Sequence, residues 1–206
     1  MRPIRFQFGE PGLRGRQPAI FLDRDGVINE RVRGGYVTRW DEFRLLDDFV
    51  PVLRALGRLR APLIVISNQS GVKKGLVDRT ALRRITSRFV EALARQGARI
   101  TAAYYCPHTD AERCGCRKPK PGMLLEAARD YRIDLSRSVM IGDSICDVEA
   151  AAAAGCRGIL LDNAGEELPR EPRGWAETAA PTWVPIKQAS DLPGQVAALL
   201  GRWCVA

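Results

Sequence analysis

The chain has 206 residues, of which 46% are hydrophobic and 27% are charged, with a formal net charge of +8. This balance excludes a wholly disordered chain, and the length suits one domain with a sizeable core. No apolar run approaches the roughly 18 residues of a membrane span, and no secretory signal precedes the domain, so we expect a cytoplasmic protein without a membrane partner. The arginines are scattered without a basic stripe, so we expect no nucleic-acid partner either.

The predicted elements follow a simple order along the chain. Residues 1–18 are rich in glycine and proline and are expected to form a flexible N-terminal arm, and residues 19–206 the domain. Apolar runs predict strands at 19–22, 63–66, 100–105, 138–141 and 158–161. Between them, helical patterns are expected from the cap Asp48 to about Arg60, from the cap Asp78 over 79–96, over 121–131, up to 154, and near 194–200.

This alternation of strands and helices predicts an α/β fold, a Rossmann-like parallel sheet with helices on both faces. Between the first two strands there is room only for a flap and one helix, so we expect no large cap domain. Active sites in such folds lie outside the carboxyl ends of the strands. The residues that follow positions 22, 66, 105 and 141 are therefore the candidates for a functional site.

A pair of carboxylates leaves the end of the first predicted strand. Asp23 and Asp25 are separated by one residue, and Gly26 permits a tight turn after them. Crowded like charges are costly unless a cation or a proton offsets them, and a divalent metal would do so. One carboxylate could then be a nucleophile and the other a general acid and base. The alternative is a loop-forming pair that caps a helix.

Polar residues also follow the second and fourth predicted strands. The hydroxyl of Ser67, with the backbone N–H groups after it, can grip a phosphate oxygen, or the segment is a plain turn. Asp143 is a hard oxygen ligand suited to Mg²⁺. Asp147 could orient the metal site or a lysine, or it could cap the helix that follows.

Three cysteines and the only histidine of the chain lie close together, at Cys106, His108, Cys114 and Cys116. Soft sulfur and nitrogen donors in two pairs predict tetrahedral Zn²⁺, and four protein ligands predict a structural site. The alternatives are a disulfide pair or buried thiols. The zinc loop, residues 106–116, would fix the segment that leads to Lys118, whose ammonium can reach a phosphoryl group or the nucleophilic carboxylate. As a solvated surface charge, Lys118 would have no such role.

With these motifs in this order, the chain resembles the haloacid dehalogenase superfamily of phosphotransferases. The matching motifs are Asp23-x-Asp25-Gly26, Ser67, Lys118, and Gly142-Asp143 with Asp147. The resemblance covers about residues 19–200, and the Cys/His loop makes it closest to the branch that contains sugar bisphosphate and histidinol-phosphate phosphatases. It implies a phosphatase whose substrate is a small phosphorylated sugar, with histidinol phosphate as the alternative, and we expect a monomer.

The resemblance also implies roles for individual residues. Asp23 would take the phosphoryl group, and Asp25 would protonate the leaving group and then activate water. Ser67 and Lys118 would hold the transferring group, while Asp23, the main-chain carbonyl of Asp25, and Asp143 would hold Mg²⁺. The expected substrate contacts are Asn29, Asn68, Ser70 and Arg117.

One departure and two other readings remain. Relatives in the superfamily often have Lys after the Gly-Asp of the last motif, where this chain has Ser144. A phospho-accepting receiver module would need an aspartate at the end of a middle strand, and none ends the run at 100–105. A polynucleotide 3′-phosphatase would need basic stripes interleaved with stacking aromatics, and only 7% of the residues are aromatic.

Overall fold

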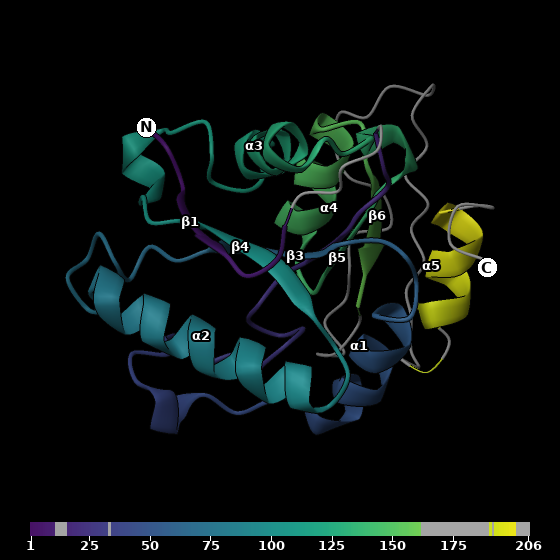
Figure 1. Ribbon diagram of the computed structural model, residues 1–206. Coiled ribbons are helices and arrows are strands. Elements are labelled where there is room, and N and C mark those ends of the chain that lie inside the picture. Colours follow the sequence, from purple (N-terminus) through teal and green to yellow (C-terminus); the bar gives the residue numbers. More distant parts are fainter. Residues whose placement is uncertain (11–15, 33, 162–189, 191, 201–206) are drawn as a thin grey trace.

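The structure is a computed structural model, and it describes all residues except 11–15, 33, 162–189, 191 and 201–206. The described strands form one six-stranded sheet in the order β1-β4-β3-β2-β5-β6 (Figure 1). Neighbouring strands from β4 to β6 run parallel, and β1 runs antiparallel to β4. The strands are β1 (Ile4–Gln7), β2 (Ile20–Leu22), β3 (Leu63–Asn68), β4 (Ile100–Cys106), β5 (Val139–Gly142) and β6 (Arg157–Leu160).

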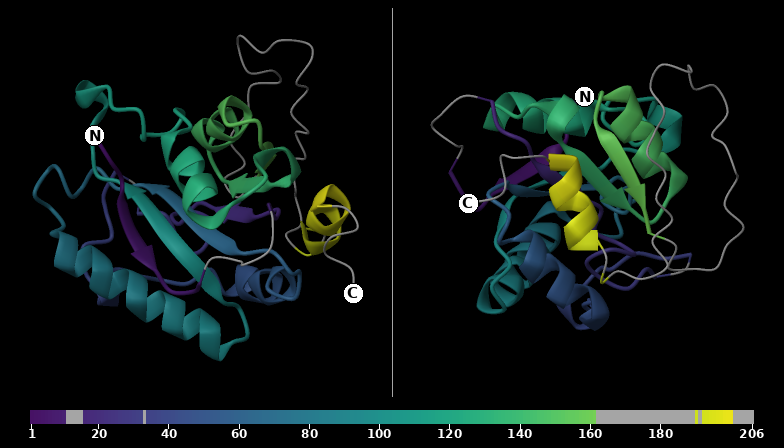
Figure 2. Two further views of the ribbon diagram at one scale, coloured as in Figure 1. Left: turned by 45° about the horizontal axis from the view of Figure 1, so that its top comes forward. Right: turned by 90° about the vertical axis from the view of Figure 1, so that its right-hand side faces the viewer.

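Helices cover both faces of the sheet (Figure 2). One face packs against α1 (Val50–Leu56), α2 (Arg79–Arg95) and α5 (Leu192–Leu200), and the other against α3 (Gly122–Tyr131) and α4 (Ile145–Ala153). Successive strand residues point to opposite faces, so Ile20 and Leu22 join the first core cluster and Phe21 the second. The predicted Rossmann-like α/β fold is therefore confirmed. None of the described helices combines the length and apolarity that crossing a membrane requires.

The expectation of a flexible arm is wrong for Ile4–Gln7, which form β1. This strand pairs with β4 and makes the sheet mixed rather than purely parallel. Ile4 and Phe6 point inward, and the Phe6 ring packs edge-on against Tyr105 with 5.9 Å between centroids. The inward–outward alternation spans only four residues beside a glycine- and proline-rich segment, and so short a pattern was outweighed by the breakers around it.

The predicted helix from Asp48 to about Arg60 is shorter than expected. A 3₁₀ turn, η2 (Asp47–Phe49), precedes α1, so Asp48 lies inside that turn and does not cap the helix. Gly57 follows the last helical residue, Leu56. The next helix is as predicted, because the Asp78 side chain accepts a 2.7 Å hydrogen bond from the Ala81 backbone at the start of α2.

Two connecting segments, the flap and the loop after β4, surround the predicted site. The flap, residues 26–46, joins β2 to η2 and contains η1 (Trp40–Glu42). The loop after β4 contains η3 (Asp110–Glu112), and η4 (Leu135–Arg137) precedes β5. The flap and the loop after β4 both lie at the carboxyl ends of the parallel strands, where the sequence predicted the site.

Candidate active site

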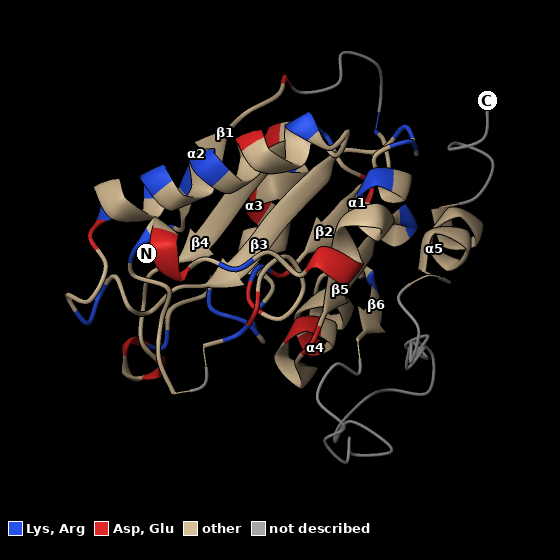
Figure 3. Ribbon diagram, turned by 90° about the horizontal axis from the view of Figure 1, so that it is seen from below, with Lys and Arg blue, Asp and Glu red and all other residues tan. Residues whose placement is uncertain are grey.

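The predicted catalytic residues meet at the carboxyl ends of β2, β3 and β5. A pocket of about 470 Å³ lies there, and its lining includes Asp23, Asp25, Ser67 and Lys118. Acidic and basic segments meet in the loops beside the ends of β2 and β3 (Figure 3). A larger cavity of about 840 Å³ lies elsewhere, along α3, and contains none of the predicted site residues.

Lys118 is buried in the floor of this pocket between two carboxylates. Its ammonium lies 2.8 Å from Asp23 Oδ1 and 2.5 Å from Asp147 Oδ1, and it donates to the Ile66 carbonyl at 2.9 Å. Burial alone would lower the pKa of Lys118, but the charges of Asp147 and Asp23 outweigh burial and raise it. Lys118 is therefore a permanent cation and not a solvated surface charge.

Asp147 combines two of the roles considered for it. Its carboxylate pairs with Lys118, and it also accepts a 3.1 Å hydrogen bond from the Ser144 backbone at the start of α4. Burial raises the pKa of Asp147 to about 6, although Lys118 acts in the opposite direction. Gly142 leaves the space that this side chain needs, because a Cβ there would lie 2.2 Å from Asp147 Oδ2.

Asp23, Asp143 and Asp147 form a cluster that fits a divalent cation. Their carboxylate oxygens lie within 4.8 Å of one another, and hard oxygen donors are the ligands that Mg²⁺ prefers. Burial, and to a lesser extent the Asp23 charge, raise the pKa of Asp143 to about 7. Gly26 is required beside the cluster, because its φ is +89° and a Cβ would lie 1.7 Å from Asp143 Oδ2.

Asp25 is held by three side chains around its carboxylate. Arg24 Nη2 donates to it at 2.8 Å, Asn29 Nδ2 at 2.9 Å and Gln69 Nε2 at 2.7 Å. Burial would raise the pKa of Asp25, but Arg24, Asn29 and Gln69 together lower it below its ordinary value. The predicted acid–base residue is thus oriented and ionised in the resting site.

The structure changes the reading of two predicted substrate contacts. Asn29 is fully buried and donates to Asp25, and it does not line the pocket. Asn68 lines the pocket, but its side chain also holds the backbone of Lys118, accepting at 3.0 Å and donating at 3.1 Å. Both residues therefore hold predicted catalytic residues in place, Asn29 holding Asp25 and Asn68 holding Lys118. Asn29 follows the acidic pair so closely in sequence that its burial beneath the turn was not apparent.

Ser70 and Arg117 line the pocket as expected. Ser70 Oγ lies 3.0 Å from the Tyr36 hydroxyl of the flap, and Lys74 Nζ donates to the same hydroxyl at 2.9 Å. Arg117 pairs with Asp110 in η3 and donates to the His108 carbonyl at 3.3 Å. These contacts join the flap and the zinc loop to the pocket wall.

Four residues of the site were missed or given little weight from the sequence, namely Arg24, Gln69, Lys74 and Arg31. Gln69 is buried and bridges Asp25 to Ser67, and Arg24 is the buried partner of Asp25. Arg31 extends from the flap to Asp143, with 2.6 Å between Nη2 and Oδ1. The position of Arg24 between two aspartates was a usable indication, but Lys74 lies in a loop and resembles any solvated lysine in sequence.

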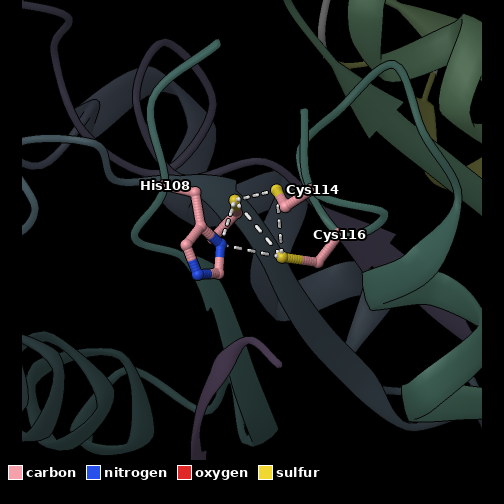
Figure 4. Close-up of side chains that lie close together, drawn as sticks. His108, Cys114 and Cys116 are labelled. Atoms are coloured by element: carbon pink, nitrogen blue, oxygen red, sulfur yellow. Dashed lines mark hydrogen bonds between the residues drawn. The ribbon is translucent and has the colours of Figure 1, made fainter. Parts of the chain in front are cut away.

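The three cysteines and His108 surround one point (Figure 4). Their sulfurs are 3.4–3.6 Å apart, and His108 Nδ1 lies 3.3 Å from Cys116 and 3.5 Å from Cys106. A tetrahedral zinc site with Zn–S bonds of about 2.3 Å has edges of roughly 3.6–3.8 Å, so the donor set fits zinc. A disulfide needs sulfurs about 2.0 Å apart, which excludes that alternative in this structure.

The Cys/His cluster is linked through its loop to Lys118. The loop packs directly on the start of α3, since a Cβ on Gly122 would lie 2.3 Å from the Gly115 carbonyl oxygen. Contacts with Cys106 and Cys114 lower the pKa of Cys116 to about 5, the direction that favours a thiolate ligand. The loop then continues through Arg117 to Lys118, so ordering it also orders the pocket wall.

Comparison with known proteins decides the family. The model of the haloacid dehalogenase-like hydrolase family matches residues 5–155, more than half of the chain. The chain belongs to this family. This family assignment, together with the similarity of the chain to named phosphatases, confirms the expectation that the chain is a phosphatase.

Among the similar proteins in the family are several heptose bisphosphate phosphatases. A D-glycero-beta-D-manno-heptose-1,7-bisphosphate 7-phosphatase of Escherichia coli K12 is 39% identical over 184 residues, covering 85% of this chain and 92% of the relative. Its counterpart in Photorhabdus laumondii is 38% identical over 183 residues, covering 85% and 93%. The crystal structure of D,D-heptose 1.7-bisphosphate phosphatase from B. bronchiseptica, complexed with magnesium and phosphate, has a TM-score of 0.73 and 32% identity, covering 87% of this chain and 98% of that one.

Proposed function

We propose that this phosphatase removes the C7 phosphate of D-glycero-D-manno-heptose 1,7-bisphosphate through an aspartyl-phosphate, with Mg²⁺ as cofactor. The observation that carries the proposal is the buried contact of Asp23 with Lys118 beside Asp143, inside a pocket open to a small molecule. The names of the relatives supply the substrate. A solved relative binds magnesium and phosphate, which supports the cofactor.

Asp23, Asp143 and the main-chain carbonyl of Asp25 would hold Mg²⁺, which supplies the positive charge that lets a carboxylate approach an anionic phosphate. The chain's own residues do the rest of the work. An Asp23 oxygen attacks phosphorus, and the bond between phosphorus and the sugar oxygen breaks. Lys118 and Ser67 hold the transferring group, whose charge needs cations and donors that are already in place.

Asp25 moves the protons in both halves of the reaction. It gives a proton to the departing sugar oxygen, then takes one from the water that attacks the aspartyl-phosphate, which releases phosphate and restores Asp23. Asp25 is ionised at rest because Arg24, Asn29 and Gln69 favour its charged form. An incoming phosphate anion raises the pKa of this carboxyl, since a nearby like charge favours the protonated form, so Asp25 takes up a proton from solvent as the substrate binds and then gives it to the leaving group.

The pocket favours a substrate with a second anionic group. Among the described residues, three cations line it besides Lys118, namely Arg31, Lys74 and Arg117. The distal phosphate of a sugar bisphosphate would meet this positive charge. Histidinol phosphate, the alternative, carries an ammonium group that these cations would repel. The charge of the pocket lining therefore supports the sugar bisphosphate.

We also propose that zinc bound by Cys106, His108, Cys114 and Cys116 is structural. The four donors leave no position for a substrate, and the loop that they close holds the segment of Arg117 and Lys118. Residues 19–206, together with strand β1 (Ile4–Gln7) of the same sheet, would act as one phosphatase domain with this zinc loop. A cytoplasmic, monomeric protein remains our prediction.

A phosphate-release screen tests the function. The substrates are the heptose 1,7-bisphosphate, histidinol phosphate and a 3′-phosphorylated oligonucleotide, each with Mg²⁺. We expect the heptose to react fastest and to keep its C1 phosphate, which ³¹P NMR would show. Asp23→Asn should remain folded and lose turnover, whereas Asp41→Asn, at an exposed flap position, should match the wild type. Faster release from histidinol phosphate, or turnover by Asp23→Asn, would contradict the proposal.

A further inference from the structure

A flap arginine occupies a carboxylate that the proposed Mg²⁺ site needs. Arg31 Nη2 lies 2.6 Å from Asp143 Oδ1, and the exposed fraction of the side chain is 49% for Arg31 and 11% for Asp143. The next residue in sequence, Ser144, is neutral and takes part in capping α4. Lys118 pairs with Asp23 and Asp147. The cation recorded on Asp143 in the described part of the chain thus comes from the flap.

We propose that Arg31 is a positioning residue that competes with the divalent cation for Asp143, so that cation binding releases the tip of the flap from the site. This inference rests on the Mg²⁺ site of the proposed function. A guanidinium and a divalent cation repel each other, so they cannot both bind closely to one carboxylate. Because linkage is reciprocal, Arg31 weakens cation binding by the same factor by which the cation weakens the Arg31 contact.

The flap is built so that only its tip need move. Its far part is anchored, since Val37 is buried and the Tyr36 ring lies against Gly71, where a Cβ would come within 2.9 Å of the ring. Near the tip, Val32 is exposed and Gly34 has a φ of +68° with open space where a Cβ would be. The Arg31 contact therefore holds a lightly packed segment over the carboxylates.

Calorimetric titration of the full-length protein with MgCl₂, without substrate, tests the competition directly. An ion pair that is half exposed contributes up to about 1 kcal/mol, so Arg31→Gln should bind Mg²⁺ about fivefold more tightly. Lys74→Gln is the matched control, because it removes the same charge from the same pocket lining without a recorded contact to Asp143. Its Mg²⁺ affinity should stay within about twofold of the wild type.

Hydrogen–deuterium exchange supplies a second readout that is independent of activity. Mg²⁺ should speed exchange of the amides of the wild-type flap tip at residues 30–32, 34 and 35. In Arg31→Gln these amides should exchange quickly with or without Mg²⁺. If Arg31→Gln binds Mg²⁺ no more tightly than the wild type, or if Lys74→Gln gains as much affinity as Arg31→Gln, the proposed competition is wrong while the metal site still stands. Failure of the wild type to bind Mg²⁺ would overturn the proposed metal site together with it.

Discussion

Lys118→Met tests the charge balance at the floor of the site. Methionine matches the aliphatic part of the lysine side chain, so the change removes the ammonium while largely keeping the packing. Lys118 is buried and contacts Asp23 at 2.8 Å and Asp147 at 2.5 Å, so its loss leaves two buried carboxylates without their cation. Breaking a buried ion pair in this way costs about 3–5 kcal/mol. For a protein of this size, a cost of about 3 kcal/mol lowers Tm by roughly 6–12 °C.

The loss of stability in Lys118→Met should depend on pH and on Mg²⁺. The pKa of Asp147 is already raised to about 6 with lysine present, and it rises further without that charge. An acid with a raised pKa in the folded state destabilises the fold as pH rises through that window, because the unfolded state gives up its proton first. The destabilisation should therefore be small near pH 4.5 and complete near pH 8. Mg²⁺ should restore part of the stability at pH 8 by neutralising the same carboxylates.

Urea denaturation at the two pH values, with and without MgCl₂, measures these effects. Lys120→Met is the control, because the Lys120 side chain is exposed and its ammonium donates to the Arg113 carbonyl. The change in its unfolding free energy should stay within about 0.5 kcal/mol. Wild-type stability of Lys118→Met at pH 8, or a loss of equal size at both pH values, would refute the reasoning from a buried, charged cluster.

Three further predictions concern the metal sites. Gly26→Ala should weaken Mg²⁺ binding at least tenfold in calorimetry, because its Cβ would lie 1.7 Å from Asp143 Oδ2; unchanged affinity would contradict the fit of this turn. Cys116→Ser should lose zinc in elemental analysis and melt at a lower temperature, whereas a wild-type zinc content would show that Cys116 is not a ligand. Mg²⁺ binding should release close to one proton at pH 6 and almost none at pH 8.5, because the pKa of Asp143 is about 7 and the cation must displace that proton. Calorimetry in buffers of different ionisation enthalpy measures the release, and a value independent of pH would exclude Asp143 as the titrating ligand.

The fold could be predicted from sequence wherever the pattern was local. Apolar runs separated by amphipathic helices specify a parallel sheet, and parallel strands place their following loops at one edge. Asp23, Ser67 and Asp143 were found in this way, each directly after its strand. Strand β1 was not, because four alternating residues specify an edge strand only through pairing with β4, nearly a hundred residues further along the chain.

Within the site, the sequence did not predict the buried side chains that hydrogen-bond to the predicted catalytic residues. Arg24, Asn29 and Gln69 all orient Asp25, and none of these contacts follows from residue type or spacing alone. A buried polar side chain is defined by what the tertiary structure brings against it, since a burial cost must be offset by a specific hydrogen bond. Asn29 shows the consequence, because a polar residue just after a catalytic motif was assigned to the substrate although it is enclosed beneath the turn.

The charges of the assembled site explain why a divalent cation is needed before an anionic substrate can bind. Four carboxylates, of Asp23, Asp25, Asp143 and Asp147, face two buried cations, Arg24 and Lys118, which leaves two negative charges when all are ionised. The Arg31 side chain offsets one of them, so the metal-free pocket floor is still negative and repels phosphate. A divalent cation that takes Asp143 brings the charge of the floor to zero and frees the Arg31 guanidinium, which lines the same pocket and makes its net charge positive. On this reasoning the cation makes the site attractive to an anionic substrate before any bond is broken.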